Sequence, residues 1–139
     1  HNLGAIIRSA ECAGAHGVII PKRRSVGLTA TVAKASAGAV EYMKVAKVTN
    51  INAAIEELKE KGVWVFGTAA EGSIPMYRAD LTVPAAIVIG SEGEGMSRLV
   101  QKNCDVTVNI PMKGRINSLN ASAAASILLY EAVRQRLSK

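Results

Sequence analysis

Aromatic residues are scarce in this chain. One Trp, three Tyr and one Phe make up 4% of its 139 residues. Proteins that hold single-stranded nucleic acid commonly stack the bases on aromatic rings, so this composition argues against a stacking platform. Any affinity for nucleic acid would have to come mainly from contacts with the phosphates.

Cysteine and histidine are also few. Cys12 and Cys104 are far apart and match no CxxC pattern, so we expect two reduced thiols in the core. His1 and His16 are too few and too scattered for metal chemistry, and we expect His16 in a turn. These counts lead us to expect no metal site.

Long apolar runs are missing as well. The longest, at residues 18–20 and 85–89, are far shorter than the roughly 20 residues that cross a bilayer. We therefore expect no membrane span. A basic, apolar leader is not recognisable either. Because the first residue is His1 rather than Met, we also expect the chain to be a piece of a longer protein.

The chain is rich in apolar residues, and its basic residues outnumber its acidic ones. With 139 residues and 49% apolar content, it is expected to form one domain over residues 1–139. Its 17 Lys and Arg against 11 acids give a net charge of +6, which favours a polyanionic partner such as nucleic acid. The basic residues that we expect to contact RNA are Lys22, Arg23, Arg24, Lys113 and Arg115.

Helical and extended patterns alternate along the chain. We expect helices at residues 2–13, 28–39, 52–61, 97–103 and 117–137, the third of them capped by Asn52. Extended segments are expected at residues 18–20, 42–48, 63–66, 85–89 and 106–110. This alternation predicts an α/β fold with one mainly parallel sheet covered by helices on both faces.

Ligands of such folds collect at the carboxyl ends of the strands, where three glycine-containing loops follow the strands that end at Phe66, Ile89 and Ile110. Residues 90–95 lack the GxGxxG spacing, and Glu92 and Glu94 would repel a pyrophosphate. The loops therefore favour a ligand with an adenosine moiety and a positive centre but no phosphate. The alternative is that they are only tight turns.

The third loop leads into a helix rich in small residues. Ser118, Ser122 and Ser126 recur every four positions, so on a helix they would form one stripe that a ligand or backbone can approach closely. The alternative is a buried helix that uses Ala and Ser for tight packing.

Three long segments resemble the signatures of the SpoU-type (TrmH) RNA ribose methyltransferases. They are residues 2–10 (NLGAIIRSA), 89–97 (IGSEGEGMS) and 110–124 (IPMKGRINSLNASAA). They occur in this order and together span nearly the whole chain. The resemblance is greatest to the catalytic domain of bacterial enzymes that methylate a guanosine ribose 2′-hydroxyl in large-subunit (23S) rRNA, with tRNA as the alternative substrate.

The resemblance implies a SPOUT fold with a deep trefoil knot near the carboxyl terminus, S-adenosylmethionine as cofactor, and a cytoplasmic homodimer with active sites near its interface. It also implies that a preceding strand and any upstream RNA-binding domain are missing from this chain. The residues implied to line the cofactor pocket are Gly67, Thr68, Ala69, Gly90, Glu92, Gly93, Ile110, Met112, Ser118, Leu119 and Asn120.

The implied chemistry is displacement at a methyl carbon by the RNA 2′-hydroxyl. Arg8 is the main candidate for catalysis. Because arginine is essentially never neutral in proteins, we expect Arg8 to act as a fixed cation that holds an RNA phosphate and lowers the pKa of the hydroxyl. The proton would pass to water or to Glu92. The alternative is that Arg8 only forms a helical ion pair with Glu11.

The resemblance implies supporting roles for three more residues. Asn2 would orient the target ribose or Glu92, and Ser118 and Asn120 would bind the 2′-oxygen or the arginine. Two other classes of protein stay open at this point. One is a non-catalytic RNA-binding module with the same fold, and the other is a dinucleotide-dependent oxidoreductase, which the loop spacing disfavours.

Overall fold

A computed structural model describes residues 2–23, 37–70, 73–91 and 94–138. The chain divides into two compact units, His1–Ile51 and Asn52–Lys139, and each is described by itself. Every strand pairing in both units is parallel, as predicted. The expected single sheet is not formed among the described residues, because they pair as one two-stranded and one four-stranded sheet.

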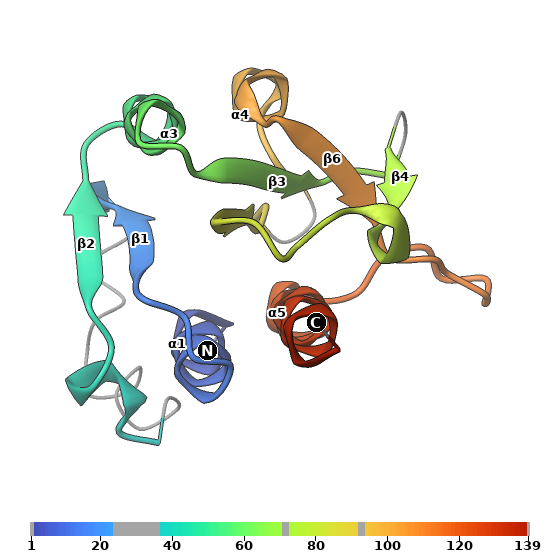
Figure 1. Ribbon diagram of the computed structural model, residues 1–139, viewed down its shortest axis with the longest axis horizontal. Helices are drawn as coiled ribbons and strands as arrows, with labels where there is room; N and C mark the ends of the chain where they lie inside the picture. The colour runs from blue at the N-terminus through green and yellow to red at the C-terminus, as the bar shows by residue number, and fades with distance from the viewer. Residues whose placement is uncertain (1, 24–36, 71–72, 92–93, 139) are drawn as a thin grey trace. The chain divides into compact units, whose positions relative to one another are not determined.

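The first unit is built on helix α1 (Asn2–Cys12) and the parallel strands β1 (Val18–Pro21) and β2 (Val45–Val48), labelled in Figure 1. The buried residues Gly4, Ile7 and Ala10 lie three positions apart, as expected for one helix face. This face packs on the 3-10 helix η2 (Ala39–Glu41). The predicted helix at residues 2–13 and strand at residues 18–20 are confirmed.

Two predictions for the first unit need correction. The extended segment expected at residues 42–48 begins only at Val45. The helix expected at residues 28–39 falls mostly outside the described residues, and it does not include Ala39. Ala37 and Gly38 have φ of 55° and 85°, and such left-handed backbone ends a right-handed helix, so Ala39 starts η2 instead.

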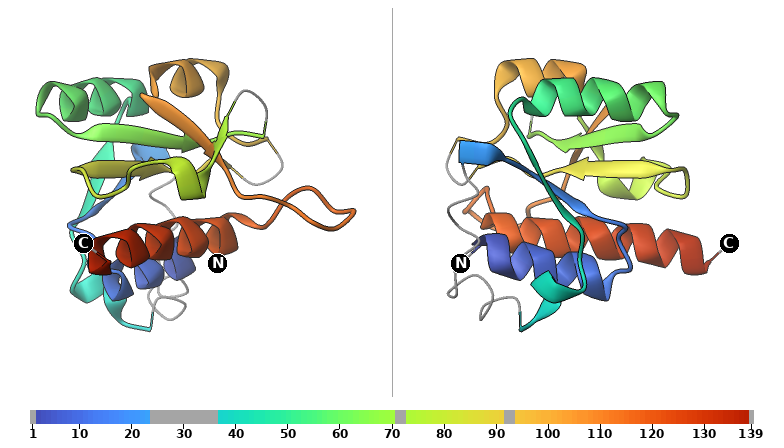
Figure 2. Two further views of the ribbon diagram at one scale, coloured as in Figure 1. Left: turned by 45° about the vertical axis from the view of Figure 1, so that its right-hand side comes forward. Right: turned by 90° about the vertical axis from the view of Figure 1, so that its left-hand side faces the viewer.

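The second unit contains the four-stranded sheet in the order β4-β6-β3-β5. Its strands are β3 (Trp64–Thr68), β4 (Ile74–Pro75), β5 (Ala85–Val88) and β6 (Val106–Asn109). Helices α3 (Ile51–Glu60) and α4 (Arg98–Asn103) cover one face, and α5 (Ala121–Leu137) covers the other, as Figures 1 and 2 show. Helices on both faces were predicted and are confirmed. Strand β4 was not predicted, because two residues are too short for a recognisable alternation.

The core of the second unit lies between the sheet and α5. Phe66 and Val108 come from neighbouring strands, Leu128 comes from α5, and Met76 and Leu81 come from the 3-10 helix η3 (Met76–Arg78) and the turn after it. All five are at most 5% exposed. Burial of apolar side chains from both layers holds α5 against the sheet.

Helix α5 begins four residues later than expected. The side-chain oxygen of Asn120 accepts a hydrogen bond from the backbone N–H of Ala123 at 2.8 Å, and this cap sets the helix start. Ser118 therefore lies outside the helix, and the expected stripe of three serines is wrong. Only Ser122 and Ser126 lie one turn apart, with the Ser126 hydroxyl donating to the Ser122 carbonyl at 3.0 Å.

Asn52 was expected to cap α3 but lies inside it. Its side-chain oxygen accepts a hydrogen bond from Nδ2 of Asn103 at 2.7 Å, which ties α3 to α4. The expectation for the cysteines was wrong for Cys12, which is exposed at the end of α1, whereas Cys104 is half-buried; both thiols are free.

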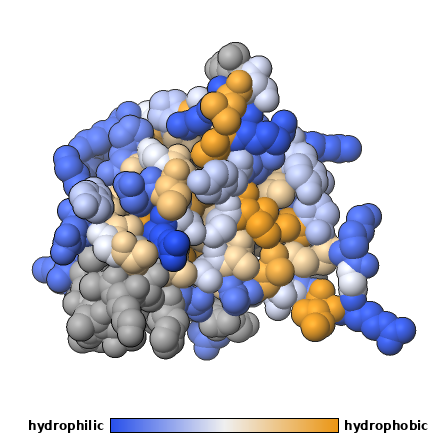
Figure 3. Space-filling model, turned by 90° about the horizontal axis from the view of Figure 1, so that it is seen from below, coloured by the Kyte–Doolittle hydropathy of each residue, from blue (hydrophilic) through white to orange (hydrophobic). Residues whose placement is uncertain are grey.

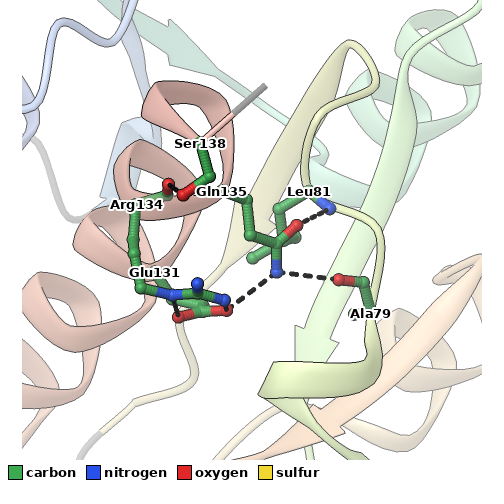
Figure 4. Close-up of polar contacts among 6 residues, drawn as sticks. All are labelled: Ala79, Leu81, Glu131, Arg134, Gln135 and Ser138. Atoms are coloured by element: carbon green, nitrogen blue, oxygen red, sulfur yellow. Dashed lines mark hydrogen bonds and ion pairs between the residues drawn. The ribbon is translucent and has the colours of Figure 1, made fainter.

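A polar cluster around the buried Glu131 also ties α5 to the rest of the second unit (Figure 4). Glu131 is 6% exposed and accepts hydrogen bonds from Nε and Nη2 of Arg134 at 2.8 and 2.9 Å and from Nε2 of Gln135 at 2.8 Å. Gln135 also donates to the Ala79 carbonyl at 2.9 Å and accepts from the Leu81 N–H at 2.8 Å. The helix is therefore joined by specific hydrogen bonds to the segment that connects η3 to β5.

We expect this cluster to make stability depend on pH. The hydrogen bonds from Arg134 hold the pKa of Glu131 below its ordinary value, although burial opposes them. A depressed folded-state pKa stabilises the protein above the ordinary glutamate pKa of about 4.3, and this contribution is lost as the pH falls further. Glu131→Gln should therefore lower the free energy of unfolding by about 1 to 3 kcal/mol at pH 7. In urea titrations the difference from the unsubstituted protein should shrink towards pH 3. A difference that stays constant with pH would contradict the role of the charge.

Candidate functional site

The first predicted loop follows β3 and is held at both ends. The Thr68 hydroxyl donates to the Val88 carbonyl at 3.1 Å, and the Ala69 N–H donates to the Val108 carbonyl at 3.0 Å. At the other end, the Ser73 hydroxyl donates to the Ala69 carbonyl at 2.6 Å and accepts from Nδ2 of Asn109 at 3.1 Å. The carboxyl ends of β3, β5 and β6 are thereby joined at the edge of the sheet where the sequence predicted a site.

The second predicted loop follows β5 and closes on itself. Ser91 and Gly95 exchange backbone hydrogen bonds, with N···O distances of 3.1 and 2.8 Å, and Gly95 has a φ of 70°. A Cβ on Gly90 would lie 2.4 Å from the carbonyl carbon of Gly95, so only glycine fits there. The predicted site residues Glu92 and Gly93 lie outside the described residues.

Gly67, at the end of β3, is crowded in the same way but by side chains. A Cβ at this position would lie 2.7 Å from Sδ of Met96 and 2.6 Å from Sγ of Cys104. Burial raises the pKa of the Cys104 thiol, with a smaller contribution from the charge of Asp105, and its Sγ donates to the Val100 carbonyl at 3.3 Å. The raised pKa disfavours the thiolate form of Cys104, whose sulfur packs against the backbone of Gly67.

A cavity of about 320 Å³ opens between these two loops and α4. Thr68, Ala69 and Ala70 form one wall, and the second loop and α4 supply Glu94, Gly95, Met96 and Gln101. The volume lies at the lower end of the range of about 300 to 1,000 Å³ found for small-molecule sites. Thr68 and Ala69 were predicted to bind the cofactor, and Gly67 and Gly90 shape the adjoining backbone.

Sequence reasoning missed the contribution of α4 to this cavity. Ser97 caps the helix by accepting a hydrogen bond from the Val100 N–H at 3.2 Å, and Gln101 follows one turn after the cap. A helix at residues 97–103 was predicted, but its cap at Ser97 was not, so the signal for Gln101 was its place one helical turn beyond a loop already expected to bind a ligand.

The third predicted loop does not line this cavity. Residues 111–120 are all exposed, and Figure 2 shows the segment before α5 extending away from the sheet. Ile110 packs against the core instead. The side-chain oxygen of Asn120 is occupied, since it accepts hydrogen bonds from the Ala123 N–H and from the Ser122 hydroxyl at 3.0 Å. This exposed segment contains residues predicted to bind the cofactor or RNA, namely Met112, Lys113, Arg115, Ser118 and Leu119.

Arg8 and Asn2 lie on α1 in the first unit. Arg8 is exposed, and within the described ranges its guanidinium forms no hydrogen bond or ion pair. The helical ion pair with Glu11, the alternative reading of Arg8, is therefore not formed. Of the basic residues expected to contact RNA in this unit, Lys22 and Arg23 are exposed, and Arg24 lies outside the described residues.

Two further observations concern only the part of the chain that the structure describes. No three His, Cys, Asp or Glu side chains there are grouped so that they could hold a metal ion. None of its helices combines the length and the apolar character needed to span a membrane.

The architecture matches that of a known class of protein, the SPOUT-fold methyltransferases. Over residues 1–130 the chain matches the SpoU rRNA Methylase family, and it belongs to that family. The resemblance to the SpoU-type (TrmH) family and the expected α/β fold class are thus confirmed, whereas the closer resemblance to enzymes that methylate a 23S rRNA guanosine stays a prediction. The knot near the carboxyl terminus stays a prediction.

The chain is similar to curated proteins of Gram-positive bacteria. It is 55% identical over 136 residues to YacO of Bacillus subtilis (strain 168), which is assigned to the TrmH family of tRNA/rRNA methyltransferases. It is 57% identical over 136 residues to a protein of Staphylococcus saprophyticus with the same assignment. Each alignment covers 98% of this chain and 55% of the relative, so the chain spans about half the length of these relatives.

Solved structures have the same fold as this chain. The SpoU methyltransferase AviRb from Streptomyces viridochromogenes, in complex with AdoMet, superposes with a TM-score of 0.92 and 34% identity, covering 99% of this chain and 56% of AviRb. The A. aeolicus TrmH/SpoU tRNA modifying enzyme superposes with a TM-score of 0.90 and 31% identity, covering 99% of this chain and 70% of that enzyme. The matching family is named for rRNA, the curated relatives are assigned to tRNA/rRNA methyltransferases and the A. aeolicus protein is a tRNA modifying enzyme, so these matches do not separate the two substrates.

Proposed function

We propose that residues 1–139 form the catalytic domain of an RNA methyltransferase that transfers a methyl group from S-adenosylmethionine to a ribose 2′-hydroxyl. The observation that carries this proposal is the cavity at the end of β3, which lies beside Gly67 and beside Gly90, where the backbone of residues 95–96 leaves no room for a Cβ. It lies in a chain that superposes over 99% of its length on a SpoU methyltransferase in complex with AdoMet.

The described residues suit such a cofactor. Glu94 is the one charged side chain among the described residues that line the cavity, and a carboxylate favours a cationic ligand. The absence of a side chain at Gly67 and Gly90 lets the second loop, Met96 and Cys104 pack close to the backbone beside the cavity. When bound, S-adenosylmethionine would supply an activated methyl group that the ribose oxygen can displace. The residues proposed to hold it are Gly67, Thr68, Ala69, Gly90, Glu92, Gly93, Ile110, Met112, Ser118, Leu119 and Asn120.

The proposed catalytic part of the site is Arg8, with Asn2 on the same helix. Because Arg8 is exposed and without a described partner, its guanidinium is available to an RNA phosphate. Held there, its fixed positive charge lowers the pKa of the nearby 2′-hydroxyl, and the proton leaves to water or to Glu92. Asn2 orients the ribose or Glu92, and Ser118 and the side chain of Asn120 bind the 2′-oxygen or the arginine.

The RNA itself is proposed to lie along the basic residues. Lys22, Arg23, Lys113 and Arg115 are exposed, and we include Arg24 with them. Contacts of this kind are to phosphates, so RNA affinity should fall steeply as salt concentration rises. We propose a guanosine of large-subunit rRNA as the target. The alternative is tRNA, because the A. aeolicus relative is a tRNA modifying enzyme.

We also propose that the protein acts as a cytoplasmic homodimer. Apolar side chains reach the surface on the side where α5 lies, as Figure 3 shows. On α5 itself, Tyr130 is 47% and Leu137 is 81% exposed. A second copy that covers such side chains would remove apolar area from water, which favours association. Light scattering at several protein concentrations measures the mass directly.

The test of function is methyl transfer by the 139-residue chain from labelled S-adenosylmethionine to purified rRNA and tRNA. Ribose methylation blocks alkaline cleavage at the next phosphodiester, so the label should appear in alkali-resistant dinucleotides from rRNA. Label in tRNA alone would establish the alternative substrate. Salt-sensitive RNA binding without affinity for S-adenosylmethionine would show a non-catalytic RNA-binding module instead.

A further inference from the structure

Two polar side chains in the cavity form no hydrogen bond or ion pair with other residues that the structure describes. Among the described residues, the Glu94 carboxylate forms no ion pair and the Gln101 side-chain amide forms no hydrogen bond, yet both line the cavity. The backbone of Gln101 is used by α4, since its N–H donates to the Ser97 carbonyl at 3.0 Å. Its side chain is therefore available to a ligand.

The other described residues that line the cavity offer fewer polar side-chain groups to a ligand. Ala69, Ala70 and Met96 are apolar, and the hydroxyl proton of Thr68 is already donated to the Val88 carbonyl. Specific recognition of a polar group by side chains in this cavity thus falls to Glu94 and Gln101. A carboxylate attracts an ammonium group, and a neutral amide N–H donates to a carboxylate. An α-amino acid carries both an ammonium group and a carboxylate, so Glu94 and Gln101 together complement an α-amino acid.

S-Adenosylmethionine has two ends, and the cavity suits one of them better. By the family resemblance, backbone groups of the cofactor pocket read the adenine, so that end of the cofactor needs no polar side chain. Ile110 and Leu119, which the resemblance also places in the cofactor pocket, do not line this cavity. The cavity with the carboxylate and the amide is then the place for the polar amino-acid end.

We propose that Glu94 binds the α-ammonium group and Gln101 the α-carboxylate of the cofactor's amino-acid moiety. This inference rests on the proposed function, since it assumes that S-adenosylmethionine occupies the cavity. It makes Glu94 and Gln101 determinants of cofactor binding, which neither the signature segments nor the loop spacing had assigned.

Calorimetric titration of the 139-residue chain with three ligands tests this assignment. S-Adenosylmethionine and S-adenosylhomocysteine both carry the amino acid, whereas 5′-methylthioadenosine keeps the adenosine and sulfur but lacks it. Glu94→Gln and Gln101→Leu should each weaken the first two ligands by about tenfold to a hundredfold, as expected for a lost hydrogen bond to a charged group. Affinity for 5′-methylthioadenosine should change less than twofold. Lys102→Ala, an exposed neighbour on α4, is the matched control and should leave all three affinities unchanged.

Several results would overturn the assignment. Equal losses for all three ligands would place Glu94 and Gln101 at the adenosine end, and unchanged affinities would remove them from the site. A loss in Glu94→Gln confined to S-adenosylmethionine would place the carboxylate at the sulfonium, because S-adenosylhomocysteine lacks that charge. If the unsubstituted chain binds none of the three ligands, the proposed function fails together with this inference. Binding of all three before substitution separates the two failures.

Discussion

Arg8→Ala is expected to slow methyl transfer to RNA by about 10²- to 10³-fold, the loss typical when a fixed charge that stabilises a transition state is removed. The reason is that the 2′-hydroxyl loses the cation that lowers its pKa, so its oxygen becomes a poorer nucleophile. Affinity for S-adenosylmethionine should not change, because the cavity described above is lined by residues of the other unit. Single-turnover assays with labelled cofactor measure the rate, and calorimetry measures the affinity.

Two further variants make this result interpretable. Glu11→Ala should keep the full rate, since Glu11 and Arg8 form no ion pair in the described structure. Arg8→Lys keeps the positive charge but loses the planar fork that binds a phosphate through two hydrogen bonds, so it should recover only part of the rate. Near-normal turnover by a folded Arg8→Ala protein would remove Arg8 from the mechanism.

Gly90→Ala is expected to destabilise the second unit and to abolish tight cofactor binding. The new Cβ would lie 2.4 Å from the carbonyl carbon of Gly95 and 2.5 Å from the Met96 nitrogen. Both are backbone atoms, so no rotation of a side chain relieves the clash, and the closed loop must open. Overpacking of this kind costs about 1 to 3 kcal/mol of unfolding free energy. Urea titration should show this loss, and calorimetry should show a fall in cofactor affinity of at least tenfold.

The chain offers a matched control for that substitution. Gly114 has no atom within 4 Å of an added Cβ, so Gly114→Ala introduces the same methyl group without a clash. It should leave both the unfolding free energy and the cofactor affinity within the error of measurement. If Gly90→Ala behaves like Gly114→Ala, the close approach between the two ends of the second loop does not determine the shape of the site.

Much of the secondary structure was predictable because its signals are local. The apolar runs at β1, β3, β5 and β6 are read from a few adjacent residues, and the structure confirms strands at all four. Other features were missed because they depend on contacts between residues that are far apart in the sequence. β4 consists of two residues and exists only through pairing with β6. The start of α5 was misplaced because the cap forms at Asn120, although serine and asparagine candidates precede it.

By itself the sequence determined the family, the parallel α/β architecture and the loops in which to seek a cofactor site, because signatures, apolar runs and glycines are properties of neighbouring residues. Only the tertiary structure decided which side chains share a cavity. Gln101 meets Thr68 there across 33 positions of sequence, and Gln135 meets Ala79 across 56. Such encounters depend on how helices pack on a sheet, and the spacing along the chain does not encode that packing in any local pattern.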